Sequence, residues 1–573
     1  MTRTFDAIEL EVLWGSLVAT VNEQAKALQR AAFSPIVREA GDLANALFDR
    51  RGRMVAQAVT GTPGHINSLA IACRNILDRH PVDSLTRGDV LVTNDPYQTA
   101  GQLLDVTVLV PVWRGGRVIA FFGSTIHHTD VGGYGIGAGA RDVFEEGLWI
   151  PISKLMVGGE RNEPVWDFVL ANVRQPTHMA GDLHAQMASG EVGAARLKTL
   201  LDAYALDDIE DLGDEVIRRS EEATRRAIRA LPGGTYEAAS ILDLADGSEI
   251  TIKVAVTIDP DAGEILVDYA GSSGASPFGI NVVKNYTHAY TTFTLRSLLN
   301  PDVPNNAGSL APIKVEAPLG SIVNAVSPSP CTARHVVGMF LPMPLLNAMS
   351  QALPEAVMAE GSAAVWTMQV SGHDAEGKPF ITAMFTYAGG VGARAGKPGL
   401  STTSYPTGVS AVPLEVVEAS APIRFLRKEL RRGSGGAGAQ EGGMGQTIEF
   451  TVDSPSPWVL NAVASRLARG PRGIFGGGEG ATGRFLVNGE PVRTQARITL
   501  QPGDVVRLEL PGGGGYGTPV GETGAAGAGV GVGVGVGANV GVGVGVGVGV
   551  GVGVGANVGV GVGVGANAGV SAV

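Results

Sequence analysis

The chain has 573 residues with 43 basic and 55 acidic side chains, which gives a formal net charge of −12 at pH 7. This acidic balance argues against a nucleic-acid-binding protein, and the length allows about three or four domains. The two cysteines, Cys73 and Cys331, are too few for a disulfide framework, and no apolar leader follows Met1. We therefore expect a cytoplasmic protein with no nucleic-acid partner.

The first 192 residues combine one long helix with hairpins. Apolar residues at mixed three- and four-residue spacings predict an amphipathic helix over 7–31. Turn residues between apolar runs predict one hairpin over 46–55 and a second over 106–126. The far end of the second hairpin delivers His127 and His128. We predict that residues 1–192 form a catalytic and metal-site region.

The middle of the chain predicts a helical insertion followed by a mixed region. Charged amphipathic patterns predict two helices over 194–205 and 214–231, within an insertion at 193–232. Residues 233–432 form a central α+β region that opens with a three-stranded antiparallel meander. Its predicted strands are 236–244, 249–258, 265–269, 364–370 and 379–387, and its predicted helices are 284–299 and 336–353.

The C-terminal part is rich in glycine. Short strands are predicted at 446–452, 483–487 and 504–510, in a β region over 433–520. Residues 521–573 alternate Gly and Val, and Gly at every second position disfavours a membrane-spanning helix. We predict a disordered tail and no membrane partner, with a membrane or assembly segment as the alternative. The predicted fold class is multi-domain α+β, with mixed sheets and helices and a β-rich C-terminal part.

Candidate chemistry gathers around the second hairpin. Its two strands bring Asp105 and His127 toward one end. Imidazole and carboxylate at converging strand ends can bind a divalent metal, while adjacent histidines on a strand face opposite sides. Only one of His127 and His128 is therefore expected to be a direct ligand. The alternative is a histidine held by a carboxylate in a buried polar network.

Nucleotide-binding motifs fail on inspection. Gly396-Lys397 is followed by Pro398 and not by Ser or Thr, so the chain has no P-loop there. The glycines at 135, 137 and 139 do not have the G-x-G-x-x-G spacing. No G-x-S-x-G elbow is present to support a serine nucleophile. We expect this chain to bind no nucleotide cofactor itself.

The order of several motifs resembles the hydantoinase B and 5-oxoprolinase family. That family includes N-methylhydantoinase B subunits and the large subunits of acetone and acetophenone carboxylases. The motifs are Ser34-Pro35-Ile36-Val37-Arg38-Glu39, Asn94-Asp95-Pro96-Tyr97, His127-His128-Thr129-Asp130, Glu146-Gly147-Leu148, Asn172-Val173-Arg174 and the glycine-rich runs at 433–438 and 512–517. The resemblance implies a hydantoinase A type partner that binds ATP and activates a cyclic amide. This chain would complete the reaction within a hetero-oligomer.

The resemblance also implies a metal site. In similar members the loop before the hairpin reads Gly-Gly-Thr-His-Leu-Pro-Asp, and its His and Asp join the later His as ligands. Here Asp105 and His127 remain, but Gln102 stands in the place of the first His. An amide oxygen is a harder ligand than imidazole, which moves preference toward Mg or Mn over Zn. We predict Asp105, His127 and Gln102 as ligands of a divalent metal (Mn, Mg or Zn).

Three further residues are predicted to be catalytic: His128 and Asp130, which would orient the ligands or move protons, and Glu146. The first functional hypothesis is the opening of a hydantoin, 5-oxoproline or related lactam ring. The second is carboxylation of a ketone enolate. The third is a non-catalytic subunit that has lost its metal with the change to Gln102.

Overall fold

The computed structural model describes residues 3–59, 62–363, 365–494 and 497–519. Residues Met1–Thr518 form one compact unit. Within the described residues the strands make four sheets with helices packed on them, which confirms the α+β class. The predicted tail at 521–573 lies outside the described residues. The predicted subdivision at residues 192, 232 and 432 stays a prediction.

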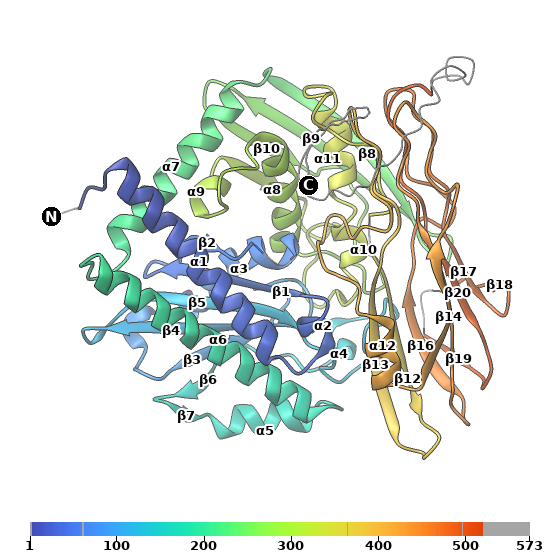
Figure 1. The fold of residues 1–573 in the computed structure, drawn as a ribbon, viewed down its shortest axis with the longest axis horizontal. Coiled ribbons are helices and arrows are strands. Elements are labelled where there is room, and N and C mark those ends of the chain that lie inside the picture. The colour runs from blue at the N-terminus through green and yellow to red at the C-terminus, as the bar shows by residue number, and fades with distance from the viewer. Residues whose placement is uncertain (1–2, 60–61, 364, 495–496, 520–573) are drawn as a thin grey trace, which may run out of the picture. The chain divides into compact units, whose positions relative to one another are not determined.

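A seven-stranded sheet carries the N-terminal part, in the order β2-β1-β5-β4-β3-β6-β7. Its strands are β1 (Leu43–Asp49), β2 (Met54–Gln57), β3 (Val90–Thr93), β4 (Asp105–Arg114), β5 (Arg117–His127), β6 (Ser153–Val157) and β7 (Glu160–Arg161). The helices α1 (Ala7–Ala31) and α6 (Pro176–Ala203) pack side by side on one core of this sheet, and α3 (Pro63–Arg79) packs on another (Figure 1). Both predicted hairpins are confirmed.

The register of the β4–β5 hairpin positions the site. Asp105, the first residue of β4, lies directly opposite His127, the last residue of β5. Cross-strand partners in an antiparallel pair point to the same face of the sheet. The two side chains therefore start from neighbouring positions at the end of the hairpin.

Helix α6 begins at Pro176, well before the predicted start at residue 194. Its buried face uses small residues, because a Cβ at Gly193 would lie 2.7 Å from the ring of Phe122 on β5. Such a face lacks the periodic large apolar residues that mark an amphipathic helix. The second helix of the predicted insertion is α7 (Glu210–Arg229), close to its expected bounds.

The central sheet confirms the predicted meander and extends it. Its order is β11-β10-β9-β8, with β8 (Gly234–Asp243), β9 (Glu249–Asp259), β10 (Glu264–Asp268) and a parallel fourth strand β11 (Ile313–Glu316). Helix α8 (Lys284–Leu299) agrees with the sequence expectation. The helix predicted over 336–353 is wrong as one element, since it divides into α10 (His335–Gly338) and α11 (Pro342–Met349). Pro342 has no N–H and its ring obstructs the carbonyl four residues earlier.

Two sheets make up the β-rich C-terminal part. The first has the order β13-β12-β16-β19 and the second β14-β15-β20-β17-β18. Their strands are β12 (Trp366–His373), β13 (Pro379–Tyr387), β14 (Ile423–Leu430), β15 (Gln446–Val452), β16 (Trp458–Val463), β17 (Arg484–Val487), β18 (Glu490–Pro491), β19 (Ile498–Leu500) and β20 (Val506–Glu509). A shared core that includes Trp366 and Trp458 joins them.

The remaining helices are short connections. They are α2 (Pro35–Arg38), η1 (Val82–Ser84), α4 (Val143–Glu146), α5 (Glu163–Ala171), α9 (Ala307–Leu310) and α12 (Leu414–Ser420). In the part of the chain that the structure describes, no helix has the length and apolar character to cross a membrane.

Candidate functional site

Asp105 is the hub of a buried polar cluster. Its side chain has no exposed surface, although it stands at the start of a strand. One oxygen, Oδ1, accepts a hydrogen bond from Gln102 Nε2 at 2.8 Å and lies 3.0 Å from His127 Nδ1. The other, Oδ2, lies 2.9 Å from His65 Nε2 and accepts a hydrogen bond from Arg334 Nη2. Four side chains thus share the two oxygens.

The turn before β4 places Gln102 beside this hub. Asn94 follows β3 and holds the turn from inside, because its amide donates to Leu103 O at 2.6 Å and to Leu148 O at 2.9 Å. Its oxygen accepts from Ile150 N at 2.6 Å. The backbone N–H of Asp105 then donates to Gln102 O at 3.2 Å. The motif around Asn94 is therefore a structural turn that presents the site residues.

His65 is held between two carboxylates. It lies in the first turn of α3, with Pro63 at the helix start, and only 3 % of it is exposed. Its Nδ1 lies 3.3 Å from Asp42 Oδ1, while Nε2 contacts Asp105. Burial would lower the pKa of this imidazole, but the charges of Asp105 and Asp42 outweigh burial and raise it. The ring therefore favours the protonated form.

Arg334 supplies a fixed positive charge. Its guanidinium is buried, donates to Ala100 O and Asp105, and lies 4.0 Å from the centre of the Tyr286 ring. Burial by itself would raise the pKa of the Asp105 carboxyl. The charges of Arg334 and His65 outweigh burial and hold that pKa well below its usual range. Asp105 is consequently an anion at every physiological pH.

A small cavity borders these side chains. Its volume is about 30 Å³, and Asp42, His65, Gln102, His127, Arg334 and His335 contribute to its walls. Burial and the neighbouring Arg334 lower the pKa of His335 to about 3, so this ring is neutral. Such a volume accommodates water, whereas pockets for small organic molecules measure about 300–1,000 Å³. An organic substrate must displace lining side chains to reach the cluster.

The three predicted metal ligands come together, but as a hydrogen-bonded network. Gln102 Nε2 lies 2.8 Å from Asp105 Oδ1 and 2.9 Å from His127 Nδ1. An ionised carboxylate accepts only N–H or O–H donors, so the amide nitrogen faces it and the oxygen expected to bind metal is turned elsewhere. Within residues 3–59, 62–363, 365–494 and 497–519, no three His, Cys, Asp or Glu side chains form a metal-holding group.

The charge of the cluster also opposes a divalent cation. Arg334 already contacts Asp105, and protonated His65 balances Asp42, so the anions of the cluster have cationic partners. A divalent ion next to Arg334 would meet a like charge at short range. In this arrangement the residues do not fit a metal, and whether the trio takes one up stays a prediction.

His128 and Asp130 have partners of their own away from the hub. Burial lowers the pKa of His128, and its nearest influences are Asp182 and Gln186 of α6. Asp130 forms an ion pair with Arg174 and accepts a backbone hydrogen bond from Gly132 at 3.1 Å. Both arrangements hold the segment after β5 against neighbouring elements. The catalytic roles predicted for these two residues stay predictions.

Glu146 supports the turn that carries Arg334. It is 1 % exposed, and its Oε1 accepts from Cys331 N at 2.6 Å and from Thr332 N at 2.5 Å. Its Oε2 is buried without a hydrogen-bond partner among the residues described. Burial raises the pKa of the carboxyl to about 7, against the lowering effect of the hydrogen bonds from Thr332. Glu146 can therefore change protonation near neutral pH, one turn away from Arg334.

Sequence reasoning missed two members of the cluster. His65 and Asp42 lie in short polar motifs that are also typical of helix caps and surface charges. Arg334 lies 229 residues from Asp105 and belongs to no recognisable motif. Only the packing of the central region against the N-terminal sheet brings them together.

A protein-family model described as hydantoinase B/oxoprolinase matches residues 6–519. The chain belongs to this family. The resemblance seen in the motifs is thereby confirmed. One relative of this family member comes from Pseudomonas sp. strain NS671, and its name assigns it as the B-type component of a D-/L-hydantoinase. It is 31% identical over 550 residues, which cover 90% of this chain and 91% of the relative.

Two solved structures resemble the family member over most of its length. The ATP-dependent caprolactamase from Pseudomonas jessenii has a TM-score of 0.80 and 27% identity, covering 90% of this chain and 92% of that chain. A nucleotide-free acetone carboxylase has a TM-score of 0.81 and 18% identity, covering 90% and 76%. The second likeness shows a shared fold alone.

Proposed function

We propose that this chain is the B-type subunit of an ATP-dependent amidohydrolase that opens a hydantoin, 5-oxoproline or related lactam ring. An A-type partner would bind ATP and phosphorylate the amide oxygen. Family membership and the names of the hydantoinase and caprolactamase relatives support this class of reaction. The observation that carries the proposal is the buried cluster of Asp105, His65, His127 and Arg334 beside a cavity.

The pair of Asp105 and His127 is suited to activating water. A carboxylate on Nδ1 of a histidine fixes its tautomer and its orientation, which leaves Nε2 to act as the base. Asp105 Oδ1 lies 3.0 Å from His127 Nδ1, and His127 lines the cavity. His65 cannot take this role, because carboxylates lie at both of its ring nitrogens and favour its protonated form.

The two cations of the cluster are suited to stabilising negative charge. Arg334 and His65 both line the cavity, and their own contacts hold them in place before substrate enters. Preorganised donors in a buried site stabilise developing charge more strongly than they would in water. The phosphorylated amide is anionic, so its phosphoryl group would be drawn to this side of the cavity.

The proposed reaction balances without a further reagent. Water bonds to the activated carbonyl carbon while His127 takes its proton. The ring C–N bond then breaks, and the nitrogen receives a proton as the electron pair moves onto it. This leaves an open-chain acyl phosphate, which a second water converts into a carboxylate and inorganic phosphate.

The test measures ring opening with both subunits present. The full chain, purified with its A-type partner, is incubated with ATP and 5-oxoproline, hydantoin or caprolactam, and ADP and amino acid product are counted. We expect equal amounts of both, and a loss of about 10²–10⁴ in turnover for His127→Gln. His373→Gln, at the exposed end of β12, is the matched control and should keep full turnover.

Other results would overturn the proposal in different ways. Turnover of ATP that requires bicarbonate and a ketone would indicate a carboxylase. Full ring opening by His127→Gln would remove the base from the mechanism. No turnover with any cyclic amide or ketone, in a complex that forms normally, would indicate a subunit without chemistry of its own.

A further inference from the structure

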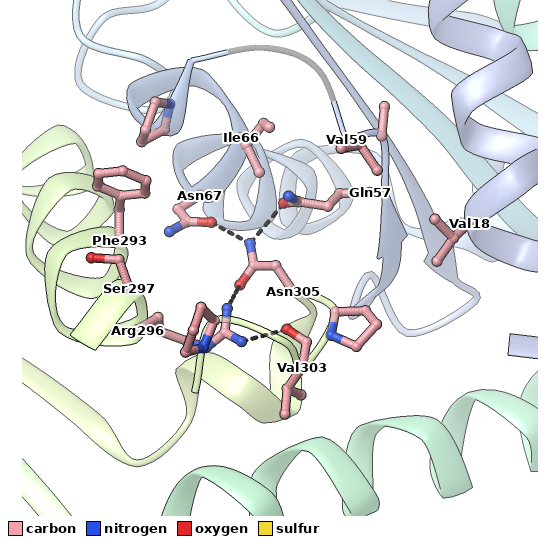
Figure 2. Close-up of a pocket in the computed structure, with 14 residues that line it drawn as sticks. Val18, Gln57, Val59, Ile66, Asn67, Phe293, Arg296, Ser297, Val303 and Asn305 are labelled. Atoms are coloured by element: carbon pink, nitrogen blue, oxygen red, sulfur yellow. Dashed lines mark hydrogen bonds between the residues drawn. The ribbon is translucent and has the colours of Figure 1, made fainter. Parts of the chain in front are cut away.

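A second and larger cavity lies behind the first turn of α3. Its volume is about 480 Å³, within the range of pockets that hold small organic molecules. Apolar side chains from three helices form its walls, including Val18 of α1, Ile66 of α3 and Phe293 of α8 (Figure 2). Ile66 follows His65 in sequence but belongs to this cavity, so α3 separates it from the Asp105 cluster.

Arg296, in the last turn of α8, is the charged residue on which the inference rests. It lines the cavity and is only 8 % exposed. Nε donates to Asn300 Oδ1 at 3.2 Å, Nη1 to Asn305 Oδ1 at 3.1 Å, and Nη2 to Asn300 O at 3.2 Å and Val303 O at 2.6 Å. A guanidinium has five N–H donors, so one hydrogen on Nη1 has no acceptor among the described residues.

All the groups that hold Arg296 are neutral. Among the described residues it makes no ion pair, whereas two other buried arginines do: Arg334 pairs with Asp105, and Arg466 lies 2.9 Å from Glu360. Burial lowers the pKa of Arg296 to about 10, so the side chain is still protonated at neutral pH. Buried charges in folded proteins are normally paired, and an unpaired one requires an explanation.

The surroundings keep this cation in one position. Asn305 donates to Gln57 Oε1 and to Asn67 Oδ1, both at 2.7 Å, while its own oxygen accepts from Arg296 (Figure 2). The carbonyl groups at the C-terminal end of α8 add a favourable dipole for a positive charge. The arginine is therefore stable without a counter-ion and is preorganised to receive one.

We propose that this cavity binds a small organic carboxylate with an apolar body. The carboxylate would accept the remaining hydrogen of Arg296 Nη1, and the apolar body would pack against Val18, Ile66 and Phe293. The apolar walls favour such a ligand over an inorganic anion, which has no apolar surface to bury. This site is separate from the proposed ring-opening centre, and its occupancy does not depend on that reaction.

Calorimetric titration of the full chain with hexanoate tests the charge, with hexanamide as the neutral ligand of matched shape. We expect hexanoate to bind at least about tenfold more tightly than hexanamide, as a charge-assisted hydrogen bond provides. Arg296→Gln should weaken hexanoate binding by about tenfold or more and leave hexanamide unchanged. Arg219→Gln is the control, because Arg219 lines the adjoining cavity but pairs with Glu215 at 2.7 Å.

A second variant keeps Arg296 in place in case its loss prevents folding. Ser297 also lines the cavity, so Ser297→Asp supplies an internal carboxylate and should block hexanoate. Equal affinity for hexanoate and hexanamide would overturn the proposal. So would undiminished hexanoate binding by both variants, or inorganic phosphate binding more tightly than hexanoate.

Discussion

Arg334 and Asp105 form a buried ion pair across 229 residues of sequence. The carboxylate stands at the start of β4 and the guanidinium comes from the turn before α10. The pair therefore ties the central region to the N-terminal sheet at the centre of the site. It also fixes the charge state of the cluster, because it keeps Asp105 ionised.

Removing the cation should destabilise the protein. Arg334→Met leaves Asp105 as a buried carboxylate without its strongest partner, and we expect a loss of about 3–5 kcal/mol in the free energy of unfolding. Denaturant unfolding of the purified chain measures this. Asp105→Asn combined with Arg334→Met should recover much of the loss, because neither charge is then left alone. A single variant as stable as the wild type would contradict the importance of the pair.

The protonation of His65 should make stability depend on pH. Its pKa is raised in the folded protein, so its contribution is fully present below its unfolded value near 6.5. The contribution is lost as pH rises through the higher folded pKa. We expect the difference in melting temperature between the wild type and His65→Gln to be larger at pH 6 than at pH 9. For His373→Gln the difference should be the same at both pH values.

Glu146 should produce a second pH dependence, in the acidic range. Its folded pKa of about 7 lies above the usual 4.5, so the stability it contributes is complete below about pH 4.5. This contribution falls as pH rises toward 7 and amounts to about 3 kcal/mol at most. Melting curves between pH 5 and 8 should show wild type losing stability relative to Glu146→Gln. The exposed neighbour Glu145 provides the control: Glu145→Gln should run parallel to wild type, and a parallel Glu146→Gln would refute the assignment.

Gln102 and Arg334 should together decide metal uptake. Gln102→His restores an imidazole beside Asp105 and His127, and Arg334→Met removes the competing cation. We expect the double variant to retain more Mn or Zn than wild type after incubation with Mn, Mg and Zn and desalting. Plasma mass spectrometry measures the content. Adding Asp105→Ala should abolish the gain, and near-stoichiometric metal in wild type would show that the cluster rearranges to accept an ion.

The sequence by itself determined the hairpins, the meander and the family. The alternation of apolar residues over 106–126 places Asp105 opposite His127, because register in a hairpin follows from its turn. These features depend on neighbours within about 20 residues, where periodicity and turn chemistry carry the information. The presence of Gln102 beside Asp105 was equally readable from one loop.

The tertiary structure decided what that pair contacts and how much water reaches it. His65 arrives on α3 and Arg334 from the distant central region, and neither has a local pattern that marks it as part of the site. The same packing buries Arg296 without a carboxylate and breaks one expected helix at Pro342. Burial and charge pairing set the pKa values and the ligands that a site accepts. Both depend on residues that only folding brings within a few ångströms of one another.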